Sequence, residues 1–457
     1  MSERVPENRM GVMPVGRLIL TMSLPMMLSM LIQALYNVVD SIFVSWISED
    51  ALTAVSLAFP FQNLLIAIAV GTSVGVNALL SRSLGEKNTA QANAAATNGL
   101  FLTVVSLLLF MLLGGLFSEL FFRLQTTSEA IIGYGASYLR ICSLFCAGLF
   151  LEIMLERLLQ STGRTFYTMI TQSLGAITNL ILDPILIFGW GPFPAMGIDG
   201  AAVATVIGQF AAAALAGLFN WRYNSDIQLQ FRGFRPNWYI ISRIYSVGLP
   251  SIVMNSIGSA MTFALNQILG AFTSTANAVL GIYFKFQSFV FMPVFGLNNG
   301  LVPIIAYNYG AKKKKRMTDT IRLGILFASA IMLAGFLLIQ FFSSQILLLF
   351  KASENMLAIG IPALKSISFA FLFVGFNIIV TSTMQSLGHG FLSMGISMIR
   401  QLLVLLPTAF FLSLTGRLEL IWWAFPIAEC VATLLCAVFL RSIYVRVIRP
   451  MPEEDAA

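Results

Sequence analysis

Residues 18–46 read LILTMSLPMMLSMLIQALYNVVDSIFVSW, and this stretch decides the class of fold. It holds a single charged residue, Asp40, in 29 positions. About 20 apolar residues are enough to cross the hydrocarbon core of a bilayer as a helix. The run is too long for the apolar region of a signal peptide, and it offers no small-residue cleavage site before Asp40. We therefore interpret it as a first membrane span that stays in the protein.

The rest of the chain continues this pattern. Of its 457 residues, 58% are hydrophobic and 10% are charged, whereas soluble proteins have about 25% charged residues. The mean hydropathy is +0.84. This composition excludes a soluble globular fold, a coiled coil and a disordered chain. We predict an all-α polytopic membrane protein with twelve spans, at 18–46, 53–79, 96–120, 130–154, 166–188, 199–220, 241–268, 277–307, 321–346, 356–384, 391–413 and 419–441.

Lys and Arg are divided unevenly between the two sides that these spans define. With the N-terminus inside, 20 of the 27 basic residues fall in cytoplasmic segments. Three (Arg123, Lys351 and Arg417) fall in outer loops, and the other four lie within spans. Because basic residues concentrate on the cytoplasmic side, both termini are predicted to be cytoplasmic. The net charge of +7 then reflects topology, and no nucleic-acid partner is expected.

The residue types and their spacing do not favour a metal site, a disulfide framework or an enzyme active site. The four cysteines, Cys142, Cys146, Cys430 and Cys436, lie in apolar runs, where they behave as small hydrophobic side chains. His389 is the single histidine, so no Cys and His cluster of the kind that binds zinc can form. No nucleophile and base stand at adjacent positions of a span. We expect no cofactor and no enzyme activity.

The sequence repeats itself, with position n of the first half matching position n + 225 of the second. The repeat covers six predicted spans, an even number, so the two halves share one orientation and should be related by an axis along the membrane normal. We predict two pseudo-symmetric six-helix bundles, 1–225 and 226–457, joined by the polar linker Trp221–Trp238. This arrangement is typical of alternating-access transporters. The matching positions are Leu24-Pro25 with Leu249-Pro250, Phe61-Gln62 with Phe286-Gln287, Gly71, Gly75 and Gly85 with Gly296, Gly300 and Gly310, and Gln160-Ser161 with Gln385-Ser386.

Two carboxylates stand inside the membrane in the first half, where ionisable residues are costly and usually functional. Asp40 lies six residues before Trp46 and Asp183 seven before Trp190, so both should sit about 10 Å below the outer interface. Asn37 and Asn179 lie three and four residues earlier, on the same helix faces. Carboxylate and amide oxygens bind a proton or a small hard cation. We predict a cation-coupling site at Asp40, Asn37, Asn179 and Asp183, with Na⁺ possible at Asp40, Asn179 and Asp183; the alternative is that each Asp bonds a neighbouring helix.

The second half lacks these acids, because Leu265 and Thr408 stand at the equivalent positions. Its own charges within spans, Lys285, Arg400 and Glu429, are interpreted as one buried polar network, with an independent functional site as the alternative. In the first half, Glu152 and Glu156 are interpreted as a solvated or salt-bridged helix end, with a role at a cytoplasmic gate as the alternative. Pro25, on the helix of Asp40, is a possible hinge, and a plain kink is the alternative.

Several stretches resemble the MATE (multidrug and toxic compound extrusion) transporters over nearly the whole chain. The C-terminal half looks most like the MepA-like bacterial branch, close to the DinF group. The stretches are Leu24-Pro25, Tyr36-Asn37-Val38-Val39-Asp40, Gly85 to Lys87, Gln160-Ser161-Thr162-Gly163-Arg164, Asn179 with Asp183, Phe291-Met292-Pro293, Gly296 and Tyr307-Asn308-Tyr309-Gly310-Ala311.

The resemblance implies a two-lobe exporter in the bacterial plasma membrane that exchanges lipophilic, often cationic, drugs for inward H⁺ or Na⁺. By this resemblance Asp40, Asn179 and Asp183 match the family's N-lobe cation site. The acids that some branches carry on helices seven and ten are absent from 241–268 and 356–384. We expect a monomer. The alternative function is a lipid-linked oligosaccharide flippase of the same superfamily, for which only Lys285 and Arg400 offer central cations.

Overall fold

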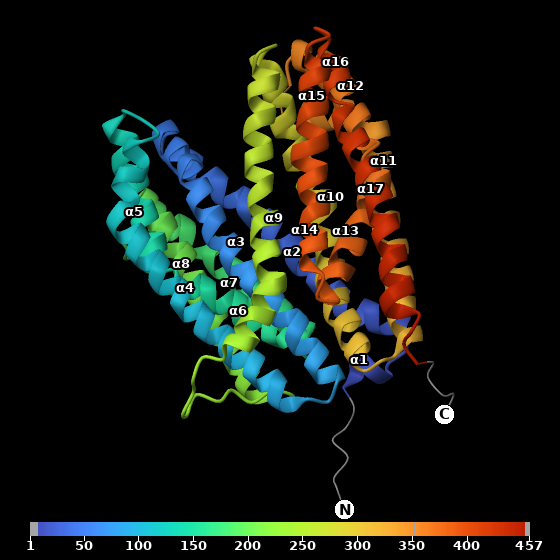
Figure 1. Cartoon of the computed structure of the whole chain (residues 1–457). Coiled ribbons are helices and arrows are strands. Elements are labelled where there is room, and N and C mark those ends of the chain that lie inside the picture. Colours follow the sequence, from blue (N-terminus) through green and yellow to red (C-terminus); the bar gives the residue numbers. More distant parts are fainter. Residues whose placement is uncertain (1–7, 351, 453–457) are drawn as a thin grey trace, which may run out of the picture. The chain divides into compact units, whose positions relative to one another are not determined.

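The computed structural model of the protein describes residues 8–350 and 352–452, and every regular element in these ranges is a helix (Figure 1). Among the described residues, ten helices are long and apolar enough to cross a membrane, and twelve spans result if the bent pairs α5–α6 and α12–α13 each count as one. The predicted all-α, twelve-span fold is confirmed. The elements are α1 (Arg9–Val12), α2 (Val15–Ser45), α3 (Glu49–Gly85), α4 (Thr89–Arg123), α5 (Glu129–Leu144), α6 (Ala147–Ser161), α7 (Thr165–Phe188), α8 (Ile198–Tyr223), α9 (Trp238–Gly270), α10 (Ser274–Gly310), α11 (Lys314–Leu349), α12 (Glu354–Ser368), α13 (Phe371–Ser386), α14 (Gly390–Met398), η1 (Ile399–Leu405), α15 (Leu406–Ser413), α16 (Leu418–Ile421), α17 (Ala424–Ile443) and η2 (Tyr444–Ile448).

Two predicted spans are broken by a bend. The axes of α5 and α6 differ by 45°, and those of α12 and α13 by 46°. Short turns keep the backbone hydrogen-bonded at each break: the Cys146 N–H donates to the Ser143 carbonyl at 3.2 Å, and the Ala370 N–H to the Ile367 carbonyl at 2.9 Å. Because these pairs lie one repeat apart, the bend belongs to the repeated unit itself.

The chain forms two compact units whose borders lie inside helices. One unit is Leu28–Ile252, and the other holds the chain up to Met27 and from Val253 onward. The two borders fall at equivalent positions of the sequence repeat, because each follows one of the matched prolines, Pro25 or Pro250, by two residues. This division differs from the border at 225/226 expected from the linker, because α2 and α9 each contribute to both units.

Close glycine contacts hold the shared helices in each unit. In the unit 28–252, a Cβ on Gly75 of α3 would lie 2.1 Å from the Ile244 carbonyl oxygen of α9. In the other unit, a Cβ on Gly300 of α10 would lie 2.4 Å from the Ser23 Oγ of α2. Gly75 and Gly300 are repeat partners. The repeat therefore preserves a crossing at which two helix backbones almost touch.

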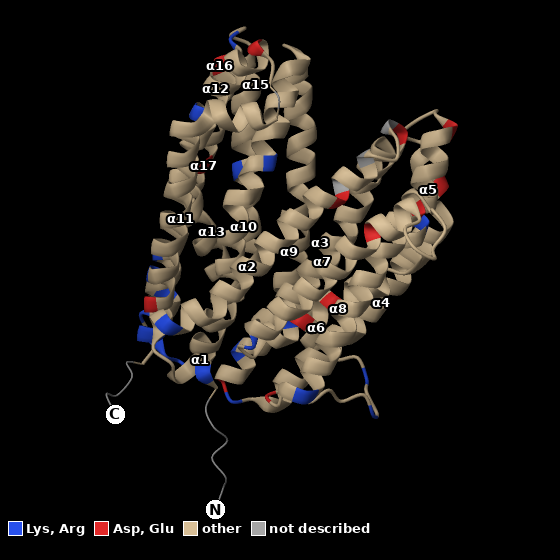
Figure 2. Ribbon diagram, turned by 180° about the vertical axis from the view of Figure 1, so that it is seen from behind, with Lys and Arg blue, Asp and Glu red and all other residues tan. Residues whose placement is uncertain are grey.

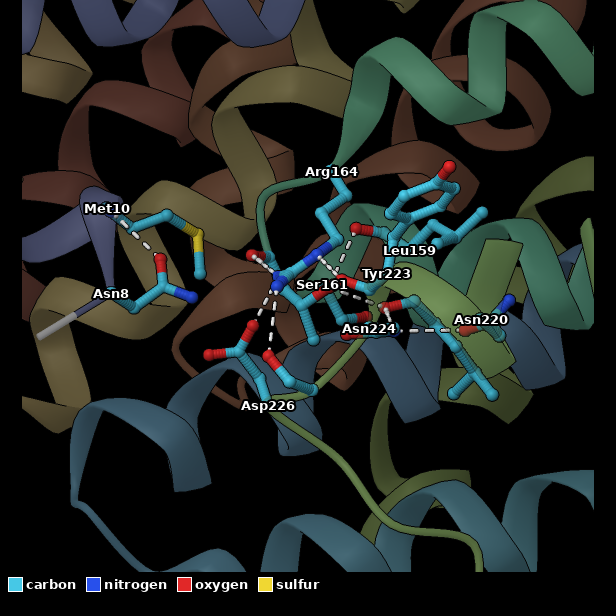
Figure 3. Close-up of polar contacts among 12 residues, drawn as sticks. Asn8, Met10, Leu159, Ser161, Arg164, Asn220, Tyr223, Asn224 and Asp226 are labelled. Atoms are coloured by element: carbon cyan, nitrogen blue, oxygen red, sulfur yellow. Dashed lines mark hydrogen bonds and ion pairs between the residues drawn. The ribbon is translucent and has the colours of Figure 1, made fainter. Parts of the chain in front are cut away.

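The linker packs along α4. Side chains of α4 accept its backbone N–H groups: Asn93 from Gln228 at 2.7 Å, Thr97 from Gln230 at 3.2 Å and Asn98 from Asn237 at 3.0 Å. Ile227, Ile240 and Ile241 join the apolar core formed with α4. Figure 3 shows Arg164, at the start of α7, paired with Asp226 of the linker. The linker is thus a fixed part of the unit 28–252.

Candidate functional site

Asp40 and Asp183 meet inside the unit 28–252. Asp40 lies on α2 and is half-buried, whereas Asp183 lies on α7 and is fully buried. The two carboxyl groups come within hydrogen-bonding reach of each other. The structure therefore brings together the two acids that the sequence placed at one depth.

Asn179 links Asp183 to a third helix. With its amide oriented so that each atom faces a partner of the opposite kind, Nδ2 donates to Oδ2 of Asp183 at 2.8 Å. Its Oδ1 then accepts from both the hydroxyl and the backbone N–H of Thr205 on α8, at 3.0 Å each. Asn179 is 2% exposed. This buried amide fixes one oxygen of Asp183 and leaves the other for a further partner.

The other oxygen of each acid is where a cation could bind. Oδ1 of Asp40 and Oδ1 of Asp183 are buried, and neither accepts a hydrogen bond from the residues described by the structure. An acceptor left unsatisfied in a buried position is costly. A proton shared between the carboxyls would satisfy both oxygens, and a small cation held by the carboxyl and amide oxygens would do the same. The donor set fits either ion.

Tyr36 also lies at the site, although the sequence analysis named it only within the stretch Tyr36-Asn37-Val38-Val39-Asp40 and not as a site residue. Its hydroxyl bonds to the Thr205 side chain, and it lies within electrostatic reach of Asp40, Asp183 and Glu152. Its place four residues before Asp40, on the same face of α2, was a usable signal. Asn37, which was predicted to support Asp40, is an exposed residue of α2, and its part in the site stays a prediction.

Glu156 is buried in the same unit, which contradicts the solvated form of the predicted helix end, whereas the salt-bridged form stays a prediction. It is 3% exposed, and its carboxylate accepts from Thr171 at 2.6 Å and from Gln172 at 2.8 Å. Gln172 in turn accepts a hydrogen bond from Ser29 of α2. A polar connection therefore joins α6, α7 and α2 at a second place along the unit.

In the other unit, Arg400 and Glu429 form an ion pair. Arg400 Nη1 lies 2.6 Å from Oε1 of Glu429, and Asn377 donates to Oε2 at 2.8 Å. Arg400 lies in the π-helical segment η1, a form that often occurs at functional sites. Lys285 has a different neighbour, because its Nζ lies 5.9 Å from the centroid of the Phe350 ring. The predicted three-residue network is thus reduced to Arg400 and Glu429, joined by Asn377.

A family comparison matches these two halves. The MatE family profile matches residues 25–185 and again residues 250–411. The chain belongs to the MatE family. The two matched segments begin at the equivalent prolines, Pro25 and Pro250, so the repeat found in this MatE protein is the repeat of the family.

Relatives and solved structures agree with this MatE assignment. The FAD transporter of Shewanella oneidensis is 28% identical over 94% of this chain and 95% of its own length. The multidrug export protein MepA of Staphylococcus aureus is 25% identical over the same shares. A structure described as the outward-facing conformation of a multidrug resistance MATE family transporter superposes with a TM-score of 0.91 at 23% identity, covering 98% of this chain and 99% of that one. The last similarity supports the MatE fold.

Removing the Glu429 carboxylate from this MatE protein should destabilise the unit that contains it, which runs up to Met27 and from Val253 onward. Glu429→Ala leaves Arg400 and the Asn377 amide without their carboxylate partner. The side chains of Arg400 and Glu429 are 26% and 12% exposed, so the cost should stay below the roughly 3–5 kcal/mol of breaking a fully buried pair. We expect a lower midpoint of thermal unfolding, followed by tryptophan fluorescence in detergent. The paired replacement Arg400→Met with Glu429→Leu should recover most of the loss. Equal losses in both variants would contradict this account.

Proposed function

We propose that this MatE-family protein is a secondary active antiporter that exports small lipophilic, often cationic, compounds in exchange for inward H⁺ or Na⁺. The observation that carries the coupling site is the contact between Asp40 and Asp183, each with a buried oxygen that accepts from no described residue. This contact favours the proton, which bridges two carboxyls directly. The MepA relatives, named multidrug export proteins, support the substrate class.

The coupling works through the charge between α2 and α7. When both carboxyls are ionised, Asp40 and Asp183 repel each other, and one bound cation turns this repulsion into attraction. Because α2 carries both Asp40 and Pro25, the cation changes the packing of a helix shared by the two units. A cation bound more tightly in the outward-open state than in the inward-open state would drive the cycle.

Purified protein in proteoliposomes tests this function. An imposed pH gradient should drive transport of ethidium, and a Na⁺ gradient at constant pH is the second arm. FAD is added as a competing substrate, because the Shewanella relative is named for it. Asp40→Asn should lose gradient-driven transport, whereas Asp50→Asn, the same change at an exposed position of α3, should keep it. Full gradient-driven transport by Asp40→Asn would refute the coupling site.

We also propose that both termini face the cytoplasm and that the single chain is the working unit. In support, Figure 2 shows Lys and Arg gathered toward the ends of the helices that carry the chain termini and the linker. Both repeats lie in one chain, so a second copy is not needed to complete the fold. Protease access to a C-terminal tag in inside-out and right-side-out vesicles tests the orientation.

A further inference from the structure

The turn between α10 and α11 repeats the turn between α3 and α4 in backbone but not in charge. Lys312 and its repeat partner Lys87 have φ angles of 58° and 56°, and they are the two non-glycine residues with positive φ in the described part of the chain. Residues 312–316 read KKKKR, whereas residues 87–91 read KNTAQ. One loop conformation thus forms with one cation or with five. Backbone geometry does not explain the four additional charges.

The cations at residues 313–316 lower the stability of α11, the helix that starts among them. In the first half, Asn88 caps α4 by accepting the Gln91 N–H at 3.0 Å. Its counterpart Lys313 gives α11 no side-chain cap, and the first turn of α11 carries no acid. Cations in a first turn oppose the helix dipole, and a missing cap lowers helix stability. Two of these cations bind the chain itself: Lys313 Nζ donates to the Gly11 carbonyl at 2.8 Å and Arg316 Nη2 to the Met13 carbonyl at 2.6 Å. Lys312 and Lys315, by contrast, have exposed side chains.

A second basic segment joins this loop. Lys314 Nζ donates to the Arg449 carbonyl at 3.2 Å, which brings the end of η2 beside the start of α11. Residues 311–324 and 441–452 together hold nine Lys and Arg and one acid, Asp319, and three more acids, Glu453, Glu454 and Asp455, follow in the sequence. Figure 2 shows basic residues gathered at this end of α11 and α17. We call the six exposed side chains the basic patch: Lys312, Lys315, Arg322, Arg441, Arg446 and Arg449.

The surroundings of the basic patch favour a lipid surface over a soluble anion. The patch lies at the ends of two candidate membrane spans, Lys314–Leu349 and Leu418–Ile448. Tyr444 and Val445, 42% and 47% exposed, stand between Arg441 and Arg446. Aromatic and apolar side chains beside cations are suited to the boundary between headgroups and acyl chains.

We propose that the basic patch binds the headgroups of anionic phospholipids, such as phosphatidylglycerol, in the leaflet that it faces. Orientation in the membrane needs only an excess of basic residues on one side, and the turn at residues 87–91 contributes to it with one cation. Clusters of four to eight Lys and Arg next to a membrane span attract anionic headgroups. This site is separate from the cation-coupling site, so it can fail without affecting the proposed antiport.

Native mass spectrometry of the full-length, delipidated protein tests the proposal. The protein is incubated with equal amounts of phosphatidylglycerol and phosphatidylcholine, and retained lipid is counted. The wild type should prefer phosphatidylglycerol, and K312Q/K315Q/R446Q/R449Q should lose that preference by about tenfold. The matched control K87Q/R222Q/R232Q/R235Q removes four exposed cations from the other unit and should stay close to the wild type.

Three outcomes would overturn the proposal. They are equal losses in the two quadruple variants, an unchanged preference in K312Q/K315Q/R446Q/R449Q, and displacement of the lipid by glycerol phosphate alone, which would indicate a site for soluble phosphate. Thermal unfolding without added lipid checks that each variant is folded. If the quadruple variant fails to fold, K312Q/K315Q should lose part of the preference, and no loss in that variant also counts against the proposal.

Discussion

Replacing Asp183 by Asn should abolish cation-driven efflux while leaving the fold intact. An amide at position 183 can still accept from Asn179, as Oδ2 of Asp183 does at 2.8 Å, and can donate toward Asp40. It therefore imitates the carboxyl with its proton bound, but it cannot release that proton. Since a transport cycle needs both states, we expect the gradient-driven rate to fall at least about 100-fold, or about 2.7 kcal/mol in activation free energy.

The exchange assay separates coupling from general damage. Exchange of labelled substrate between the two sides of a proteoliposome needs no cation gradient, so Asp183→Asn should retain exchange while it loses accumulation. Thr205→Val removes only the hydroxyl that bonds Asn179 and Tyr36, and it should slow accumulation without abolishing it. Loss of both exchange and thermal stability in Asp183→Asn would assign Asp183 a structural role instead.

The features that the sequence could predict are those that the membrane itself dictates. Span length follows from the thickness of the bilayer, so the apolar runs were sufficient to predict the twelve-span fold. A buried charge needs a partner, and Asp183 with Asn179 one helical turn earlier indicated one shared face, as the 2.8 Å contact shows. The internal repeat likewise predicted that Gly75 and Gly300 occupy equivalent places.

The features that could not be predicted depend on how the helices are rotated and packed. Lys285 lies in a span of the same half as Arg400 and Glu429, yet it contacts the Phe350 ring, because position along a helix does not fix the direction that it faces. Glu156 looked like a helix end, but its partners Thr171 and Gln172 come from α7. The division of α2 at Met27 depends on contacts with α10, which is distant in sequence.

The glycine crossings at Gly75 and Gly300 should be sensitive packing positions. Gly75→Ala would place a Cβ 2.1 Å from the Ile244 carbonyl oxygen, and backbone cannot rotate away as a side chain can. The helices must separate, and such overpacking costs about 1–3 kcal/mol. Gly300→Ala, at the repeat partner, should behave alike, because a Cβ there would lie 2.8 Å from the Ser23 Cα as well as against its Oγ.

At a control glycine, substitution by Ala should raise the midpoint of thermal unfolding rather than lower it. Gly281 lies inside α10 with nothing within 4 Å of an added Cβ, so Gly281→Ala should gain up to about 1 kcal/mol from helix propensity alone. Thermal unfolding in detergent, followed by tryptophan fluorescence, compares the three variants. Helix propensity favours Ala at all three positions. A lower unfolding midpoint for Gly75→Ala and Gly300→Ala alone would therefore show that the loss of stability comes from overpacking at the crossings. Midpoints that rise in all three would show that α3 and α9, or α10 and α2, do not approach so closely.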